Sequence, residues 1–494
     1  MKICSGCLFM SGYKQLYQDL IKQLDNSNLI QRAYKSVLYH EKWKKRIDDI
    51  TKLQGYEGLS KLPYVSADDL RIIWEKHSVE EIILTETVGF WYTTSGSMGN
   101  KKWIPWTFGD YNKAGLGIAK NLLNYLDPTD RILIIMLPPP FISGSSPFKL
   151  LENTGDMGTP IEVLAFSPEY IQDGFGLLMK RRPNVVIGTP SLVLRMAEEI
   201  AINTPLLLKE RAEEEKSIKL RIAAAATKLK KIYPKHIFRK MKYGYFGGES
   251  LDPFRKAIED KWGLEAFDVY AFTEGFSGGF ECTEHNGMHF PSPFSIIEII
   301  PESELAIEAD DPEYTPEAVI VTEAEEGLTG ELVLTDFKEA LPMIRFRVRD
   351  SVKVVSTGDC SCGLDSPRLK IIGRTDSVIN IGIIRLSAII FDQLLRKDFK
   401  FGKVNLWEVY VTREKYRPKL VLTIEPEFVK NEEEFKKELF DSLHGFDLFQ
   451  RGYDNGLFLF DEIKFVDKLK LEIYGQGKSR VVRYDPDFNK AVKM

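Results

Sequence analysis

Cysteine is scarce in this chain, with five in 494 residues, and so few thiols make no disulfide framework. Long apolar runs are also missing, because no stretch reaches the ~18 residues that a membrane-spanning helix needs. There is no excess of basic residues either: 67 lysines and arginines face 72 aspartates and glutamates. A net charge of −5 gives no support to a nucleic-acid partner. No signal-peptide or lipidation pattern stands out. We therefore expect a cytoplasmic protein with neither a membrane nor a nucleic-acid partner.

The pattern of apolar residues predicts an α/β fold. Residues 1–80 have helical spacing, as in YKQLYQDLIKQL. From about residue 129 short apolar runs such as RILIIML and NVVIGTP alternate with helical stretches, which favours a largely parallel sheet with crossover helices. Residues 293–355 are strand-rich, as in a small β-subdomain, and the chain after residue 376 resembles a compact α+β unit.

The segment TTSGSMGNKKW (93–103) is small, polar and rich in glycine. Glycines let the backbone approach an anion, and amide N–H groups with hydroxyls can surround phosphate oxygens. Lys102 adds a point charge. The spacing differs from the P-loop GxxxxGKS/T, so a P-loop nucleotidase is not indicated. Taken alone, the segment fits a plain turn as well as a phosphate site.

Four further stretches end predicted strands or form glycine-rich loops. GYFGGESLDP (244–253) offers bare backbone on which a flat ring can lie. VYAFTEGF (269–276) places a ring, a hydroxyl and a carboxylate at a strand end, the edge at which open α/β sheets bind ligands. FRVRDSVKV (346–354) contains an aspartate that can accept two hydrogen bonds from a ribose diol. YGQGKSRVVR (474–483) has a lysine in a glycine-rich loop.

This ordered set resembles the acyl-adenylate-forming superfamily, which includes acyl-CoA synthetases, luciferases and peptide-synthetase adenylation domains. It is most similar to the phenylacetate–CoA ligase branch, through FECTEHNGMH (280–289), LTDFKEALPMIRFRVRD (334–350) and DCSCGLDSPRLKIIGRTD (359–376). The resemblance implies a large N-terminal AMP-binding domain (81–373) of mixed and parallel sheets with a small β-subdomain. It also implies a small mobile α+β C-terminal domain (374–494), and residues 1–80 are then a helical extension packed on the large domain.

The resemblance also implies which residues bind ATP and which take part in the reaction. Those around the phosphates would be Thr94, Ser95, Gly96, Ser97, Gly99 and Lys102. Those around the adenosine would be Gly247, Gly248, Glu249, Tyr270, Asp350 and Arg374. Those that act in catalysis or in the domain movement would be Thr273 at the α-phosphate, Glu274 on Mg²⁺, Asp376 as the hinge, Gly382 by the thiol channel and Lys478 in the first half-reaction.

The implied activity is an AMP-forming acyl-CoA ligase. A carboxylic acid is already ionised at pH 7, so it can attack the α-phosphorus of ATP without a general base. Diphosphate leaves, and the thiol of CoA then takes the acyl group from acyl-AMP. The cofactors and partners are therefore ATP, Mg²⁺, CoA and a carboxylic acid, and the family also suggests a homodimer. Aromatic residues in LPPPFISGSSPF (137–148) and YGYFGG (243–248) favour an aromatic, phenylacetate-like acid.

Two other functions fit the same motifs. An adenylyltransferase could stop at an AMP adduct, as on a deazaflavin coenzyme, and would consume no CoA. A protein that binds ATP but has lost catalysis would also keep the fold. The lysine at 478 and the glutamate at 274 argue against that last alternative, because neither is needed for binding alone.

Three cysteines and a histidine gather in two short windows around the predicted β-subdomain. They are Cys282, His289, Cys360 and Cys362. Cys₃His is a known structural zinc set, although C-x₆-H with C-x-C differs from the usual C-x₂₋₄-C spacing. Related ligases carry similar cysteines, which supports a structural Zn²⁺, and free thiols are the alternative. His285 could replace His289 as a ligand. The pair Cys4 and Cys7 is assigned no function.

Overall fold

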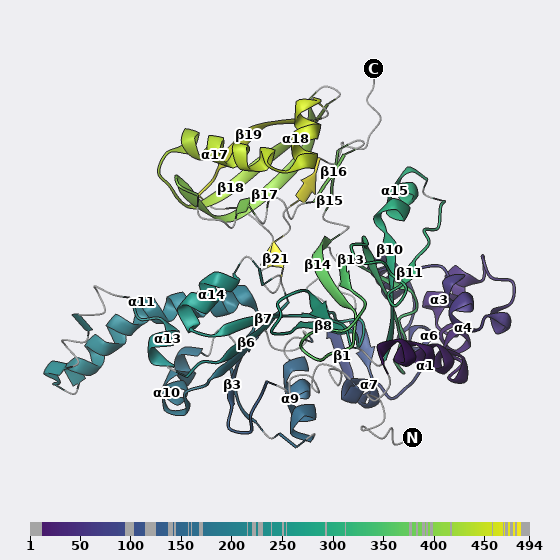
Figure 1. The fold of residues 1–494 in the computed structure, drawn as a ribbon, viewed down its shortest axis with the longest axis horizontal. Helices are drawn as coiled ribbons and strands as arrows, with labels where there is room; N and C mark the ends of the chain where they lie inside the picture. The colour runs from purple at the N-terminus through teal and green to yellow at the C-terminus, as the bar shows by residue number, and fades with distance from the viewer. Residues whose placement is uncertain are drawn as a thin grey trace. The chain divides into compact units, whose positions relative to one another are not determined.

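The computed structural model describes residues 12–485 with gaps (Figure 1). The residues left out inside that range are 94–102, 114–124, 137–141, 143–144, 157, 160, 167–170, 215, 220–223, 226–230, 239, 249–250, 253, 292–293, 312, 375–377, 382–383, 388–390, 392–393, 396–398, 415–416, 457, 468, 470–472, 475–477 and 480–481. The chain divides into two compact units. The first comprises Met1–Val348 and Lys353–Lys370, and the second comprises Arg349–Val352 and Ile371–Met494.

A 12-stranded sheet organises the first unit, and its parallel half follows the predicted βα alternation. The parallel strands are β3 (Arg131–Ile135), β4 (Glu162–Phe166), β5 (Val185–Gly188), β6 (Tyr243–Gly247) and β7 (Glu265–Ala271). They lie in the order β7-β6-β5-β3-β4 with every neighbouring pair parallel. Their side chains alternate between two apolar layers, as strands covered on both faces require.

Helices supply both layers. One apolar layer joins the sheet to α10 (Ile171–Arg181), α11 (Pro190–Glu214), α13 (Pro234–Ile237) and α14 (Arg255–Trp262), as Figure 1 shows around β3, β6 and β7. The other layer includes Leu151 of α9 (Ser146–Asp156). The first part of the charged stretch after residue 205 belongs to α11, which ends at Glu214. Pro205 lies inside this helix and does not end it.

The remaining strands, which include those of the strand-rich region, continue the same sheet. They are β8 (Gly278–Glu281), β9 (Met288–His289), β10 (Ser295–Pro301), β11 (Val319–Ile320), β12 (Thr329–Asp336), β13 (Phe346–Ser356) and β14 (Arg368–Arg374). The order is β11-β10-β12-β13-β14-β9-β8, with β8 antiparallel to β7. The expected β-subdomain is therefore joined to the parallel strands by one hydrogen-bonded ladder. An additional helix, α15 (Glu302–Asp310), follows β10.

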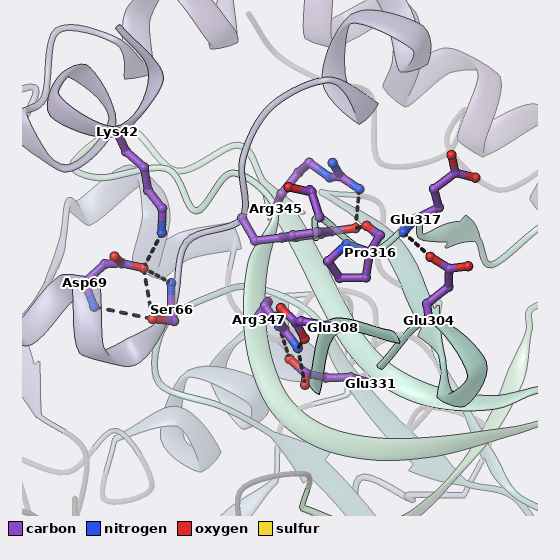
Figure 2. Close-up of polar contacts among 12 residues, drawn as sticks. Lys42, Ser66, Asp69, Glu304, Glu308, Pro316, Glu317, Glu331, Arg345 and Arg347 are labelled. Atoms are coloured by element: carbon purple, nitrogen blue, oxygen red, sulfur yellow. Dashed lines mark hydrogen bonds and ion pairs between the residues drawn. The ribbon is translucent and has the colours of Figure 1, made fainter. Parts of the chain in front are cut away.

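Short helices form the start of the described chain, beside β10 and β11 in Figure 1. They are α1 (Tyr13–Asn26), α2 (Leu29–Ala33), α3 (Val37–Trp43), a 3₁₀ turn at Ile50–Lys52, α4 (Gly55–Ser60), α5 (Ala67–Lys76) and α6 (Val79–Ile82). Local sequence sets their ends. Ser66 and Asp69 form a capping box at the start of α5, and Lys42 pairs with Asp69 at 2.8 Å (Figure 2).

Buried tyrosines attach these helices to the sheet. Tyr17 Oη accepts a hydrogen bond from the Ile297 amide at 3.0 Å, and Tyr64 Oη donates to the Pro316 carbonyl at 2.8 Å. Tyr39 Oη accepts from the Ile344 amide at 3.0 Å and donates to the Pro342 carbonyl at 2.6 Å. Each tyrosine packs its ring in the apolar interior and makes a directed hydrogen bond through its hydroxyl.

Two arginines at the start of β13 hold a buried cluster of charges. Arg347 forms a bidentate pair with Glu331, with N–O distances of 2.7 and 3.0 Å, and also contacts Glu308 at 2.9 Å (Figure 2). Glu331 is fully buried. Arg345 pairs with the buried Glu298 at 3.3 Å. A buried ion pair stabilises little by itself, but removing one partner is costly.

The second unit has a four-stranded sheet with two helices. The order is β19-β18-β17-β22, where the long hairpin of β17 (Gly402–Glu414) and β18 (Arg417–Val429) forms the centre. The other elements are β15 (Val378–Ile381), β16 (Ile384–Ser387), α17 (Glu432–His444), α18 (Asp447–Asp454), β19 (Leu459–Phe465), β20 (Ile473–Tyr474), β21 (Lys478–Ser479) and β22 (Val482–Tyr484). A layer rich in phenylalanine joins the helices to this sheet.

The α/β fold expected from the sequence is confirmed. A large sheet of mixed direction and a separate small sheet are both present. Among the described residues, no helix has the length and apolar character needed to cross a bilayer.

The buried pairs predict how Arg347 affects stability. We expect Arg347→Met to lower the free energy of unfolding by about 3–5 kcal/mol, because it removes the bidentate counter-ion of the fully buried Glu331 carboxylate. Urea denaturation followed by tryptophan fluorescence measures the change, since only Trp407 among the seven tryptophans lies beyond residue 370.

Arg181→Met is the matched control. Arg181 also forms a bidentate pair, with Glu162, but these side chains are 49% and 33% exposed. We expect no measurable change in this variant, because exposed pairs contribute little. Equal losses in both variants would contradict the interpretation of the Arg347 cluster.

Candidate functional site

Three of the predicted site residues lie at the carboxyl ends of two neighbouring parallel strands. Gly247 ends β6, and the turn with Thr273 and Glu274 follows β7. Gly247 is directly opposite Val269 in the strand register. Thr273 and Glu274 are 9% and 5% exposed. Open α/β sheets bind ligands at this edge, so the position suits a hydroxyl and a carboxylate that act on a ligand.

Glycine is required by close packing at the end of β6. A Cβ at Gly247 would lie 2.7 Å from the Val269 carbonyl oxygen, which no side chain can tolerate. Gly248 follows with φ of +92°, a conformation that L-residues rarely adopt. The Gly-Gly pair therefore presents bare backbone next to β7, as the sequence predicts for a flat ring. Glu249 lies outside the described residues.

The strand that follows the predicted phosphate loop contacts the same turn. β1 (Phe90–Thr93) and β2 (Trp103–Trp106) pair antiparallel, with Thr93 opposite Trp103. Trp106 Nε1 donates a hydrogen bond to the Thr273 carbonyl at 3.3 Å. The six residues predicted for the loop, Thr94, Ser95, Gly96, Ser97, Gly99 and Lys102, lie outside the described residues. The structure thus brings β2 to the Thr273–Glu274 turn.

The structure describes some of the other predicted residues fully, some by their main chain only, and some not at all. Tyr270 is on β7, and its ring centroid lies 5.8 Å from that of Phe290 and 6.0 Å from that of Phe272. Asp350 is on β13. Arg374 ends β14 and Lys478 begins β21, and only their main chain is described. Asp376 and Gly382 lie outside the described residues.

The three cysteines and the histidine come together in the first unit. The candidate ligand atoms of Cys282, His289, Cys360 and Cys362 all lie within 4.8 Å of one another. Cys282 Sγ is 3.9 Å from Cys360 Sγ, and Cys362 Sγ is 3.4 Å from His289 Nε2. Tetrahedral Zn²⁺, with bonds of about 2.3 Å to sulfur and about 2.0 Å to nitrogen, spaces its donors by roughly 3.5–3.8 Å. The donor types and the spacing both fit that ion.

The electrostatics of this cluster suit a metal ligand set. Burial and then the charge of Arg368 lower the pKa of His289 to about 4, so the imidazole is neutral at pH 7 and keeps a free lone pair. Burial raises the pKa of the Cys282 thiol to about 12. Burial also acts to raise the pKa of Cys360, but hydrogen bonds from Cys362 lower it overall.

Ser366 is a residue that the sequence did not reveal. Its Oγ lies 2.8 Å from His289 Nδ1, so it fixes the ring with Nε2 directed at the cluster. The alternative ligand His285 points elsewhere, toward Glu265 and Glu281 at 3.1 and 3.3 Å. His289 is therefore the histidine of the cluster.

Sequence comparisons find phenylacetate–CoA ligases. The chain is 26% identical over 398 residues to the phenylacetate-coenzyme A ligase of Pseudomonas putida, which covers 78% of this chain and 76% of that enzyme. It is 31% identical over 173 residues to the enzyme of the same name from Aromatoleum evansii, which covers 34% and 35% of the two chains. No protein-family model matches the chain.

Solved structures with the same fold are ligases and synthetases that form acyl adenylates or amides. A 2-hydroxyisobutyryl-CoA ligase with 2-HIB-AMP in its postadenylation state has a TM-score of 0.65 at 18% identity, over 96% of this chain and 90% of that one. An acyl acid amido synthetase in complex with 2,4-DB has a TM-score of 0.64 at 15% identity, over 92% and 88%. At these identities the likeness shows the fold. The chain is therefore similar in sequence to phenylacetate–CoA ligases, and it shares its fold with these acyl-activating ligases and synthetases.

Proposed function

We propose that this chain is an AMP-forming acyl-CoA ligase. It activates a carboxylic acid with ATP to acyl-AMP and transfers the acyl group to CoA. The observation that carries the proposal is the pair of turns after β6 and β7, where Gly247–Gly248 and Thr273–Glu274 lie side by side at the ligand-binding edge of the sheet. Similarity to phenylacetate–CoA ligases over 398 residues supports it.

In the first half-reaction the protein positions reactants and neutralises charge. The substrate carboxylate is ionised at pH 7 and attacks the α-phosphorus, so no side chain has to remove a proton. The Thr273 hydroxyl takes the α-phosphate, and the bare backbone of Gly247 and Gly248 receives the adenine. Glu274 and Thr273 offer the oxygen ligands that Mg²⁺ prefers, and bound Mg²⁺ would neutralise charge on the phosphates.

The remaining roles follow from the resemblance. Asp350 and Arg374 bind the ribose, and Tyr270 stacks on the adenine. Lys478 stabilises the charge that develops in the first half-reaction. The second unit then turns about Asp376, which withdraws Lys478 and brings the Gly382 region to the thiol of CoA, a hinge-type change. The homodimer stays a prediction.

For the substrate we propose an aromatic acid of the phenylacetate class. The names of the two sequence relatives support this class. Among the aromatic residues considered from the sequence, Phe246 is fully buried in a core layer with Trp262, which supports a packing role. Tyr245 points to the opposite face of β6, next to Phe267 at 5.5 Å, and its buried Oη has no hydrogen-bond partner among the described residues. Tyr245 is the better candidate for a pocket residue.

The first test is ATP–diphosphate exchange with a panel of carboxylic acids that includes phenylacetate, benzoate and aliphatic acids. We expect exchange that depends on the acid and is fastest with an aromatic one. Glu274→Gln and Lys478→Ala should each lower the exchange rate by roughly 10²–10³-fold, because each removes a charge placed for the transition state.

Two surface variants serve as controls. Glu284→Gln removes an exposed carboxylate close to the same strands, and Lys464→Ala removes a lysine that is 54% exposed on β19. Both should retain wild-type rates. Formation of acyl-CoA with added CoA then tests the acceptor. Measurable ATP binding without exchange for any acid would refute the ligase proposal and favour the adenylyltransferase or a protein that binds ATP only.

We also propose that Cys282, His289, Cys360 and Cys362 hold one structural Zn²⁺. Purified protein should contain about one zinc ion per chain by mass spectrometry, and Cys282→Ser or Cys360→Ser should lose it. Cys7→Ser is the control, because Cys7 has no role in the proposed site. Equal zinc contents in all three variants would rule out this ligand set.

The zinc site also has a predicted pH dependence. Burial raises the pKa of Cys282 to about 12, so zinc must displace a proton from this thiol. Zinc affinity should therefore rise with pH, by roughly tenfold per pH unit for each proton released, and fall on acidification. Competition with a chelator at pH 6.5 and 7.5 measures it. An affinity that does not change with pH would show that no thiol proton is displaced.

A further inference from the structure

A lysine is buried beneath the Thr273–Glu274 turn. Lys338 is fully buried, in the loop between β12 and β13. Its Nζ has no hydrogen-bond partner among the described residues and lies 5.0 Å from the centre of the Trp106 ring. That indole donates its N–H to the Thr273 carbonyl. The ammonium is therefore stacked under the ring that supports the turn.

Three carboxylates, each from a different element, act electrostatically on this lysine. They belong to Asp336 at the end of β12, Asp110 of α7 (Phe108–Lys113) and Glu274 of the turn. Burial lowers the pKa of Lys338, and the charges of these three groups act to raise it. Asp110 also accepts hydrogen bonds from the amides of Thr107, Glu339 and Ala340. The ammonium thus offsets the charges of Asp336 and Glu274 together with that of Asp110.

Hydrogen bonds hold the main chain of the loop around Lys338. Asp336 Oδ1 accepts from the amides of Lys338 and Met343 at 3.3 and 3.0 Å, which closes the loop on itself. The carbonyl of Lys338 accepts from Arg32 Nη2 at 2.9 Å. Burying an ammonium with no hydrogen bond is costly, and an apolar residue would fill this position at lower cost. A contribution to folding stability therefore does not explain why residue 338 is a lysine.

The Thr273–Glu274 turn also lies close to Asp336. A Cβ at Gly275 would lie 2.7 Å from Asp336 Oδ2, an oxygen without a hydrogen-bond partner in the described part of the chain. Backbone and carboxylate thus meet with no side chain between them. The turn contacts Asp336 at Gly275 and Trp106 at Thr273, and the Lys338 ammonium lies against the Trp106 ring.

We propose that Lys338 is a positioning residue for the adenylation step. Its ammonium attracts the carboxylate of Glu274 from below and, through Trp106, fixes the Thr273 main chain, so that the hydroxyl and the carboxylate stay directed at the nucleotide. This inference rests on the proposed ligase function. Lys338 touches neither substrate nor ATP, and it acts only through the turn.

The kinetic signature follows from that role. The turn matters most in the transition state, where a misplacement of about 1 Å can cost on the order of 10²-fold in rate. Lys338→Met keeps the chain length and removes the charge. We expect it to lower kcat for ATP–diphosphate exchange by roughly 30- to 100-fold, while KM for the carboxylic acid changes less than about twofold. Lys113→Met is the matched control, since Lys113 pairs with Glu339 of the same loop at 3.1 Å but faces solvent.

Two double variants separate positioning from structural support. If Lys338 acts through Glu274, the variant Glu274→Gln/Lys338→Met should be no slower than Glu274→Gln alone, because the effects share one target. If Lys338 is only a counter-ion of Asp336, then Asp336→Asn/Lys338→Met should regain wild-type exchange as well as wild-type thermal stability. Additive losses in the first double variant, or restored exchange in the second, would overturn the proposal.

A binding measurement tests the positioning role of Lys338 separately from the ligase function. Calorimetry gives the affinity for ATP with Mg²⁺ and with a chelator, and the ratio reports on Glu274 without any turnover. We expect Lys338→Met to reduce this ratio about tenfold and Lys113→Met to leave it unchanged. A wild-type protein that binds MgATP but does not exchange diphosphate would refute the ligase function alone. An unchanged ratio in Lys338→Met would refute the positioning role alone.

Discussion

The pairing of β7 with two neighbours of opposite direction is the constraint on which the rest of the first unit depends. β7 runs parallel to β6 and antiparallel to β8, so it joins the two halves of the sheet. The parallel partner brings the Gly247–Gly248 backbone beside the end of β7. The antiparallel partner forces a tight turn at the same end, and that turn contains Thr273 and Glu274. One strand thus provides both an edge of the kind at which open α/β sheets bind ligands and a hydroxyl and a carboxylate beside that edge.

Buried charge is concentrated in the same part of the fold. Arg345 and Arg347 at the start of β13 and Lys338 in the loop before it are all nearly inaccessible to water. Such groups cost desolvation energy and add little net stability, so hydrophobic packing must hold the fold while they fix its geometry. The two arginines have carboxylate partners at 2.7–3.3 Å and lock strands and helices together. The lysine has no such partner among the described residues, and its ammonium lies against the Trp106 ring instead.

The sequence predicted the elements whose signal is local. Apolar runs marked β3, β5 and β7, and glycines marked the turn after β6, because period, length and turn chemistry are readable within about ten residues. It did not reveal contacts between distant segments. Tyr39 reads as one more apolar helix residue, although its hydroxyl binds a loop some 300 positions away. Lys338 reads as a surface lysine, and only the folded structure shows that its environment is acidic and dry. The spacing of the cysteines did not show whether His285 or His289 is the fourth ligand. His289 lies in the β9 ladder beside the cysteines, so it is the histidine of the cluster.

The cluster of Cys282, His289, Cys360 and Cys362 lies at a very short strand of the 12-stranded sheet. β9 has two residues, and it alone connects β8 to β14, with two register pairs on each side. So short a strand contributes few hydrogen bonds, and the antiparallel half could separate there from the parallel half. His289 sits in both of those ladders, opposite Phe280 and Arg368, and it also belongs to the ligand set. Cys282 follows β8 directly, and Cys360 and Cys362 precede β14. An ion held by these four groups would tie all three strands at one point, where each ladder has only two register pairs. In that arrangement the zinc would keep β8 in register with β7, and thereby the turn that carries Glu274, without taking any part in the reaction.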